Sequence, residues 1–263
     1  MSKRISLFGA QIDALTLDEA TRTVLDWAFD EPSRCRFVVT PNVDHTVLLR
    51  ESASLREVYE AADLVLADGW PIVAASRLLG RSLPERVAGS DLVPNLFGQA
   101  TEASRTLKVY LLGAMPGVAD RAKENINREW PLIEVVGTYG PPLDFENDDA
   151  ENDAILARIE AVRPDVLIVG LGAPKQELWA YRHRGRIAAN VALCAGATID
   201  FLAGEKRRAP VWMRRTGLEW VHRIASEPRR LAGRYARDAV VFPQLVWREW
   251  RSGADQGDPT SGT

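Results

Sequence analysis

The sequence of 263 residues is poor in cysteine: it has only Cys35 and Cys194, and both lie in apolar, strand-like stretches. A framework of disulfides, as in small secreted domains, is therefore excluded, and a reducing compartment fits better. Long apolar stretches are also absent, since none reaches the roughly 18 uncharged residues that a membrane-spanning helix needs. Asp13 interrupts the apolar residues near the start, so we expect no signal peptide. These absences favour a cytoplasmic protein that is either free in solution or bound to a membrane surface.

Sequence motifs of several enzyme classes are absent too. The chain has no His-Glu-x-x-His, Cys-x-x-Cys, Gly-x-Ser-x-Gly or Gly-x-x-x-x-Gly-Lys-Ser/Thr motif, and its three histidines, His45, His183 and His222, are scattered. No convincing Asp-x-Asp follows an apolar run, which argues against a metal ion that clamps a diphosphate. We therefore expect no metal site and no resident cofactor.

Charge is distributed unevenly along the chain. The net charge is −3, but residues 1–204 hold 21 Lys and Arg against 29 Asp and Glu, whereas residues 205–251 hold 12 against 5. The basic stretch also contains four of the eight tryptophans, namely Trp212, Trp220, Trp247 and Trp250. Arginine mixed with tryptophan suits an anionic membrane surface, where the indole ring lies among the headgroups and the cation meets phosphate. The same composition would suit nucleic acid or an ordinary solvated helical face.

Short apolar runs alternate with stretches of helical periodicity in the first 204 residues. The runs cover residues 36–40, 64–68, 107–113, 133–139, 166–170 and 191–195. The helical stretches lie near residues 17–29, 42–61, 70–79, 90–104, 117–130, 151–162 and 175–184. This alternation predicts an α/β fold, in which a mostly parallel sheet is covered by helices on both faces in a Rossmann-like manner.

The alternation stops after residue 204. Helical periodicity then runs from about 210 to 250, with prolines at positions 210, 228 and 243. We therefore expect an α/β domain over residues 1–204, a basic helical appendage over 205–251 and a disordered tail over 252–263.

Ligands of parallel sheets bind beyond the carboxyl ends of the strands, so the polar residues that follow each run are candidates for a site. Thr40 and Asn42 follow the first run, where a hydroxyl and an amide could hold a sugar, or Asn42 could simply cap a helix. Asp68 ends the second run, where partial burial could raise its pKa toward that of a general base; a helix cap is the alternative. Arg86 lies in a later loop, and its fork suits a phosphate or diphosphate.

Glycine-containing turns follow three later runs, at Gly113, Gly172 and Gly196. Backbone N–H groups in such turns, with Lys175 beside them, form a site for the phosphates of a nucleotide. A dinucleotide site of the Gly-x-Gly-x-x-Gly type is disfavoured, because Lys175 occupies the position of the third glycine and no acidic residue ends the following run. Asp200 either caps a helix or contacts the substrate.

Longer motifs occur in a fixed order: TPN at 40–42, ADG at 67–69, ERVAGSDL at 85–92, GAPKQE at 172–177, DFLAG at 200–204, KRRAP at 206–210, LEW at 218–220 and EPRR at 227–230. Over about residues 4–235, this set resembles the WecG/TagA/CpsF glycosyltransferase family. The resemblance implies a bacterial enzyme that transfers a sugar, with inversion, from a UDP donor to a saccharide linked to polyprenyl diphosphate. Such enzymes serve the assembly of teichoic acid, enterobacterial common antigen, capsule or exopolysaccharide. The resemblance also implies an α/β fold with a C-terminal helical appendage that docks on the membrane.

The resemblance further implies roles for individual residues. Asp68 would be the base that deprotonates the acceptor hydroxyl, with Thr40 and Asn42 beside it. Arg86 would meet a phosphate of the acceptor or donor, and Gln176 would contact the sugar or nucleotide. The other expected substrate-binding residues are Gly113, Gly172, Lys175, Gly196 and Asp200. The arginines expected to face the membrane or the acceptor phosphate are Arg207, Arg208, Arg214, Arg223, Arg229 and Arg230.

The identity of the substrates stays open at this point. The Gly-Gly-x-Phe-Asp-Phe pattern of the family is changed here to AGATIDF at 195–201, so N-acetylmannosamine, its uronic acid and glucose all remain as donor sugars. We expect a UDP-sugar, a polyprenyl-diphosphate-linked acceptor and an anionic membrane surface as partners, no nucleic acid, and a location at the inner face of the plasma membrane; a homo-oligomer is left open. The alternatives are a nucleotide-dependent oxidoreductase of Rossmann type and a non-enzymatic module that binds anionic polymers.

Overall fold

The computed structural model describes residues 3–30 and 34–255, and its centre is a sheet of six parallel strands. The strands are β3 (Arg36–Val39), β4 (Leu64–Val65), β5 (Leu107–Gly113), β6 (Ile133–Tyr139), β7 (Val166–Gly170) and β8 (Val191–Cys194). Their order across the sheet is β4-β3-β8-β7-β5-β6, and every neighbouring pair is parallel. All six apolar runs of the sequence form strands, which confirms the predicted fold class.

Side chains of the strands enter two apolar cores, one on each face of the sheet. In β3, Phe37 and Val39 belong to one core and Val38 to the other. In β7, Val169 belongs to the first core and Ile168 to the second. Because both faces are covered, these strands are apolar at consecutive positions instead of alternating between apolar and polar residues.

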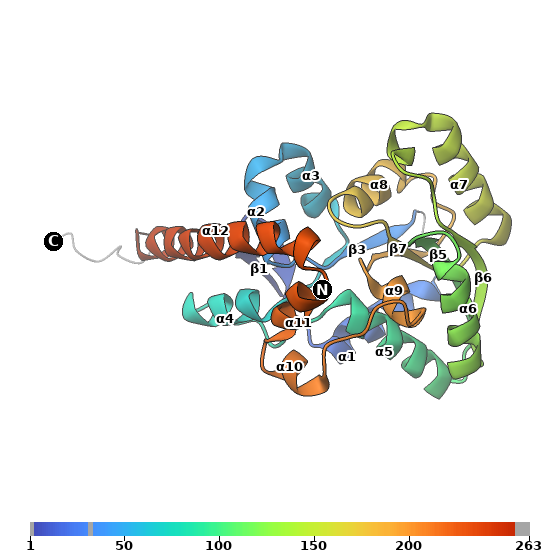
Figure 1. Cartoon of the computed structure of the whole chain (residues 1–263), viewed down its shortest axis with the longest axis horizontal. Coiled ribbons are helices and arrows are strands. Elements are labelled where there is room, and N and C mark those ends of the chain that lie inside the picture. The colour runs from blue at the N-terminus through green and yellow to red at the C-terminus, as the bar shows by residue number, and fades with distance from the viewer. Residues whose placement is uncertain (1–2, 31–33, 256–263) are drawn as a thin grey trace.

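Helices cover both faces of the sheet (Figure 1). On one face lie α1 (Leu17–Ala28), α5 (Gly89–Glu102), α6 (Val118–Glu129) and α9 (Thr198–Leu202). On the other lie α2 (Val43–Glu51), α3 (Ala53–Ala61), α7 (Asp149–Val162) and α8 (Lys175–His183), with the short 3-10 helix η1 (Phe145–Asn147) before α7. Helix α4 (Trp70–Leu78) follows the edge strand β4 and packs into the core of this second group. The two-sided cover that the sequence predicts is confirmed.

Two local features differ from the expected pattern. Residues 42–61 form two helices, because the Ser52 hydroxyl accepts a hydrogen bond from Leu55 N at 3.1 Å and begins α3. Residues near the start form an antiparallel hairpin of β1 (Arg4–Leu7) and β2 (Ala10–Asp13), which the sequence pattern does not predict. Asp13 Oδ2 accepts a hydrogen bond from Val65 N at 2.9 Å, which fastens the hairpin to β4.

The chain after residue 204 is helical, as expected, and comprises α10 (Val211–Arg215), α11 (Glu219–Ser226) and α12 (Pro228–Asp255). Helix α12 projects from the body toward the C-terminus (Figure 1), and Pro243 lies within it without ending it. The helix includes residues 252–255 of the predicted tail; residues 256–263 lie outside the described residues. Within the described ranges, no helix is long and apolar enough to cross a membrane.

Helix α12 is fastened to the body by both apolar and ionic contacts. Phe242 and Leu245 are buried in the core that also contains α2. Arg237 pairs with Asp44 of α2 at 2.5 Å. Further along, Glu249 accepts a hydrogen bond from Phe8 N at 2.8 Å. Contacts from Arg237 to Glu249 therefore join α12 to the folded body.

Candidate active site

Polar side chains gather at the carboxyl edge of the sheet, where the loops after β3 and β4 meet. Asp68 N donates a hydrogen bond to Pro41 O at 2.8 Å, so the two loops are joined. Gly69 follows with a φ of 147°, a conformation that residues with a Cβ rarely adopt, and turns the chain into α4. The Asp68 side chain keeps 29% of its surface exposed, so its carboxylate is accessible to a ligand.

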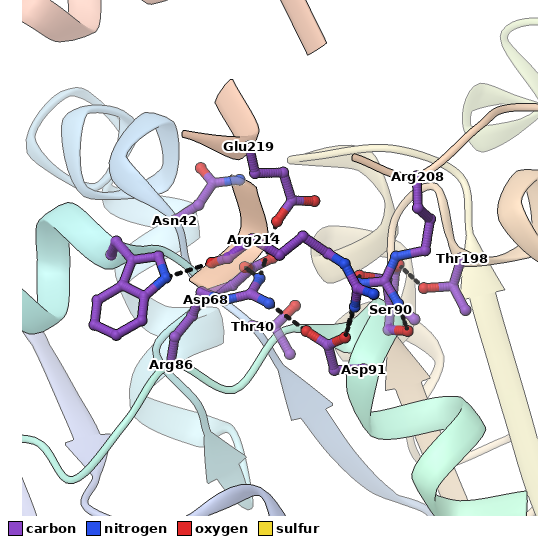
Figure 2. Close-up of polar contacts among 12 residues, drawn as sticks. Thr40, Asn42, Asp68, Arg86, Ser90, Asp91, Thr198, Arg208, Arg214 and Glu219 are labelled. Atoms are coloured by element: carbon purple, nitrogen blue, oxygen red, sulfur yellow. Dashed lines mark hydrogen bonds and ion pairs between the residues drawn. The ribbon is translucent and has the colours of Figure 1, made fainter. Parts of the chain in front are cut away.

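Arg86 lies against Asp68 and connects it to two other acidic residues (Figure 2). Its Nη1 is 3.3 Å from an Asp68 carboxylate oxygen and 3.4 Å from a Glu219 carboxylate oxygen. Its Nη2 pairs with Asp91. The Arg86 side chain is only 11% exposed, so these three carboxylates fix the orientation of its guanidinium group.

Asp91 is the centre of the basic part of the site. Besides Arg86, its carboxylate pairs with Arg208 at 2.7 Å and with Arg214 at 3.2 Å. Arg208 also donates hydrogen bonds to the backbone and side-chain oxygens of Ser90, both at 3.0 Å. Three guanidinium groups from separate parts of the sequence thus converge on one carboxylate at the beginning of α5.

The C-terminal appendage contributes directly to this site. Glu219 belongs to α11, Arg214 to α10, and Arg208 to the segment before α10. The Trp70 indole donates a hydrogen bond to Arg214 O at 2.7 Å. Gly217 packs so closely that a Cβ there would lie 3.1 Å from Cβ of Trp70. The appendage and the loop after β4 therefore form one continuous site.

The surroundings of Asp68 shift its proton affinity. Burial raises the pKa of the Asp68 carboxyl to about 6, with the negative charges of Glu219 and Asp91 acting in the same direction and Arg86 and Arg223 opposing them. The carboxyl is therefore ionised at neutral pH, yet basic enough to accept a proton from a substrate hydroxyl.

Asp91 behaves in the opposite way. Burial alone would raise the pKa of its carboxyl, but the charges of Arg208 and Arg86 outweigh this effect and lower it. Asp91 thus remains ionised and holds the arginines. Together Arg86, Arg208, Arg214 and Arg223 supply four positive charges against the three carboxylates of the site, an excess that favours an anionic ligand.

Thr40 and Asn42 lie beside Asp68 (Figure 2), as expected from the shared edge of β3 and β4. The Thr40 hydroxyl donates a hydrogen bond to Cys194 O at 3.2 Å, which ties the end of β3 to the end of β8. Asn42 caps α2, because its Oδ1 accepts a hydrogen bond from His45 N at 3.3 Å. The capping role of Asn42 is confirmed, and a role toward substrate stays a prediction.

The glycine turns lie at the same edge, after β5, β7 and β8. Gly113, at the end of β5, packs so tightly against the neighbouring strand β7 that a Cβ at this position would lie 2.4 Å from Gly170 O. Gly172 and Gly196 have φ values of 81° and 56°, in the left-handed region. Lys175 pairs with Glu146 of η1 at 2.7 Å. The turns are therefore built as predicted, while the ammonium group beside them is already paired.

The remaining residues that the sequence predicts for the site differ in their burial and in their contacts. Gln176 is only 3% exposed, and both ends of its carboxamide form hydrogen bonds inside the protein. Asp200 lies 3.4 Å from Lys206. Arg207 and Arg229 are exposed, and the Arg230 side chain lies outside the described part of the structure. The structure thus brings Asp68 together with Arg86, Arg208, Arg214 and Arg223.

Two functional candidates are missed by the sequence alone. Asp91 follows Ser90 in a motif that is fully explained as a helix start, and Glu219 lies in the short LEW motif. Neither motif reveals its distant partners. Within the described ranges, no group of three or more His, Cys, Asp or Glu side chains is arranged to hold a metal ion.

A half-buried carboxylate beside converging arginines, at the carboxyl edge of a parallel α/β sheet, is typical of an enzyme that acts on a phosphorylated substrate. The family model of the glycosyl transferase WecG/TagA/CpsF family matches residues 5–256. The chain therefore belongs to this family and is a glycosyltransferase.

Named relatives agree with this assignment. An N-acetylglucosaminyldiphosphoundecaprenol N-acetyl-β-D-mannosaminyltransferase of Staphylococcus aureus strain MRSA252 is 27% identical over 228 residues, which cover 87% of each chain. Proteins of the same name from strains MW2 and NCTC 8325 are 26% identical to this chain over 228 residues, again 87% of each chain.

Proposed function

We propose that this protein transfers a sugar, with inversion, from a UDP-sugar to a saccharide linked to polyprenyl diphosphate. The names of the relatives favour N-acetylmannosamine as the donor sugar and a diphosphate-linked N-acetylglucosamine as the acceptor. The observation that carries the proposal is the Asp68 carboxylate, whose pKa is raised to about 6, beside the guanidinium group of Arg86.

The geometry supports a single displacement. Asp68 accepts the proton of the acceptor hydroxyl, and the oxygen attacks the anomeric carbon on the face opposite UDP. The bond between that carbon and the β-phosphate oxygen breaks, and UDP leaves with the electron pair. Arg86, Arg208 and Arg214 stabilise the charge that develops on the leaving diphosphate.

UDP release over a panel of donors tests this function. We expect release with UDP-N-acetylmannosamine only when a synthetic prenyl-diphosphate-linked N-acetylglucosamine is also present, because both substrates take part in one displacement. Release with the UDP-linked uronic acid or with UDP-glucose instead would change the assigned donor sugar and leave the proposed reaction unchanged. If no donor gave acceptor-dependent release, the proposal would be wrong.

We also propose that the appendage binds an anionic membrane surface at the inner face of the plasma membrane. The tryptophans Trp212, Trp220, Trp247 and Trp250 are between 46% and 59% exposed. On α12, Val240 and Trp247 are two turns apart and share one face, and the rings of Trp247 and Trp250 lie 5.1 Å apart. Exposed arginines at 248 and 251 flank these rings. Such a surface can place indoles among headgroups and cations beside phosphates.

Replacement of both Trp247 and Trp250 by alanine is expected to lower the fraction bound to phosphatidylglycerol vesicles by about tenfold or more, because burying one large apolar side chain is worth about 1.5–3 kcal/mol. Flotation measures this fraction. Leu143→Ala is the matched control, since Leu143 is 89% exposed on the α/β body. Equal flotation of the double variant and the control would contradict the proposal.

A further inference from the structure

A hydrogen-bonded group of buried polar side chains lies under the active site. His45 of α2 is 5% exposed, and Glu177 of α8 is fully buried. His45 Nε2 lies 3.2 Å from Glu177 Oε1. The same carboxylate oxygen accepts a hydrogen bond from Gln176 Nε2 at 2.7 Å. His45 also belongs to the capping box of α2, in which its Nδ1 lies 3.3 Å from Asn42 N.

One end of this group fixes the orientation of Asn42. The Asn42 Oδ1 atom accepts a hydrogen bond from His45 N at 3.3 Å and lies 3.0 Å from His45 Nδ1. Both contacts use the oxygen, so the Nδ2 group has no hydrogen-bond partner among residues 3–30 and 34–255. Asn42 begins α2 at the edge of the sheet beside Asp68 (Figure 2). His45 therefore determines which end of the Asn42 amide a ligand meets.

The other end of the group holds a glycine turn. Gln176 Oε1 accepts a hydrogen bond from Gly196 N at 3.1 Å. Gly196 follows β8, the strand next to β3. The chain of contacts from Asn42 through His45, Glu177 and Gln176 to Gly196 thus joins the loops that follow two neighbouring strands.

Charge explains why these groups belong together. Glu177 Oε2 is buried and has no hydrogen-bond partner within the described part of the chain, and a buried carboxylate is costly unless a positive charge lies beside it. Burial would lower the pKa of His45, but its hydrogen bond to Glu177 and the charges of Glu177, Asp44 and Asp68 outweigh this and raise it. In the imidazolium form, Nε2–H points at Glu177 and Nδ1–H points at Asn42 Oδ1, 3.0 Å away, whereas in the neutral form Nδ1 can instead accept a hydrogen bond from Asn42 N at 3.3 Å.

Two other titratable groups beside the pair, Tyr59 and Cys194, are neutral. The Tyr59 ring of α3 lies 6.4 Å from the His45 ring, and its buried hydroxyl has no hydrogen-bond partner in the residues that the structure describes. Burial and the charge of Glu177 raise the pKa of Tyr59 and of Cys194 well above their ordinary values. His45 is therefore the group that compensates Glu177.

We propose that His45 and Glu177 are positioning residues for the transfer reaction, which hold the Asn42 amide with its Nδ2 toward the reacting groups and, through Gln176, hold the Gly196 turn. Neither side chain touches substrate. The proposal rests on the proposed function and adds residues that act through Asn42 and Gly196.

The test uses Glu177→Gln, His45→Gln and the double variant, with Tyr59→Phe as the matched control. Each single variant is expected to lower kcat by about 10–100-fold, since small displacements of groups around a reacting centre have effects of this size. The double variant is expected to lose much less than the product of the two single losses, because it leaves no uncompensated buried charge. Tyr59→Phe removes an unpartnered hydroxyl at the same place and should keep the wild-type kcat.

Two further readouts separate positioning from general loss of structure. In His45→Gln, the acid limb of the kcat/KM profile should move to higher pH, because a cation that favours the Asp68 carboxylate is gone. In Glu177→Gln, amide hydrogen exchange in peptides that cover Gly196 should accelerate by about tenfold, because its acceptor Gln176 is no longer held. Tyr59→Phe should show neither change.

Unchanged exchange at Gly196 together with wild-type kcat in the single variants would overturn the proposal. Strictly additive losses in the double variant would also overturn it, since the two residues would then not act as a pair. If wild-type protein released no UDP with any donor, the proposed function would fail, while the exchange measurement would still decide whether the pair holds the turn.

Discussion

Asp68→Asn is expected to lower turnover by about 10²–10⁴-fold, the usual contribution of a general base. The carboxamide has nearly the same shape and can still accept a hydrogen bond from Arg86, which lies 3.3 Å from the carboxylate. It cannot take up a proton from the acceptor hydroxyl. The dissociation constant of UDP should stay within a few-fold of the wild-type value, because the arginines proposed to meet the diphosphate remain.

Asp63→Asn provides a matched control for this variant. Asp63 lies just before the amino end of β4, pairs with Arg34 at 2.7 Å and is remote from the carboxyl edge. The control should keep wild-type turnover in the UDP-release assay, and calorimetry with UDP reports binding in both variants. Wild-type turnover of Asp68→Asn would remove Asp68 from the role of base. Loss of UDP binding in parallel with turnover would instead assign it to the nucleotide site.

Arg86→Lys is expected to lower kcat/KM by about 10²–10³-fold, which is typical when one preorganised donor to a developing anion is lost. Arg86 reaches Asp68, Asp91 and Glu219 with two nitrogens of a planar fork. An ammonium group is a compact point charge and cannot span three carboxylates on separate elements. The pKa of Asp68 should also rise, because Arg86 is the group that lowers it most.

Arg81→Lys is the control for Arg86→Lys. Arg81 also pairs with a carboxylate, Glu249 at 3.0 Å, but it does so at the outer part of α12. Steady-state kinetics and the dissociation constant of UDP should be unchanged in the control and weakened in Arg86→Lys. Equal kinetics and equal UDP binding in the two variants would exclude Arg86 from the diphosphate site.

The architecture of the sheet could be predicted from the sequence because its signal is local. A strand such as Val166–Gly170 is buried on both faces, so its residues are apolar without interruption. The hairpin of β1 and β2 could not be predicted, since each strand has only four residues, too few for a clear periodic pattern. Pro243 would ordinarily end a helix, yet α12 continues through it.

The site could be predicted only in part, for a related reason. Asp68 is identifiable because a carboxylate at the end of a buried strand is unusual. Asp91 is not, because a helix start accounts for it fully, and its partners Arg208 and Arg214 are 117 and 123 residues away. Pairing between distant charged side chains depends on how the appendage docks, which no local pattern encodes. The position of the Gln176 side chain is likewise not encoded by a local pattern, because its contact with Gly196 forms only in the folded structure.

The contribution of the appendage to the site has a consequence for the enzyme. Glu219 and Arg223 act on the pKa of Asp68 from α11, in opposite directions. Arg208 and Arg214 reach Asp91 from the same C-terminal part of the chain. The segment proposed to meet the membrane thus also supplies groups next to the proposed base, although the residues proposed for lipid binding and those of the site are different.

The pH dependence of kcat/KM, measured for wild-type protein and for Asp68→Asn, tests the central claim most directly. Because Asp68 must be ionised to accept a proton, the account predicts that wild-type kcat/KM falls as the pH drops through about 6, the raised pKa of this carboxyl. The residual activity of Asp68→Asn should lack this limb. A wild-type profile that stays flat through pH 6 while the protein remains folded, or the same acid limb in Asp68→Asn, would contradict the assignment of Asp68 as the base.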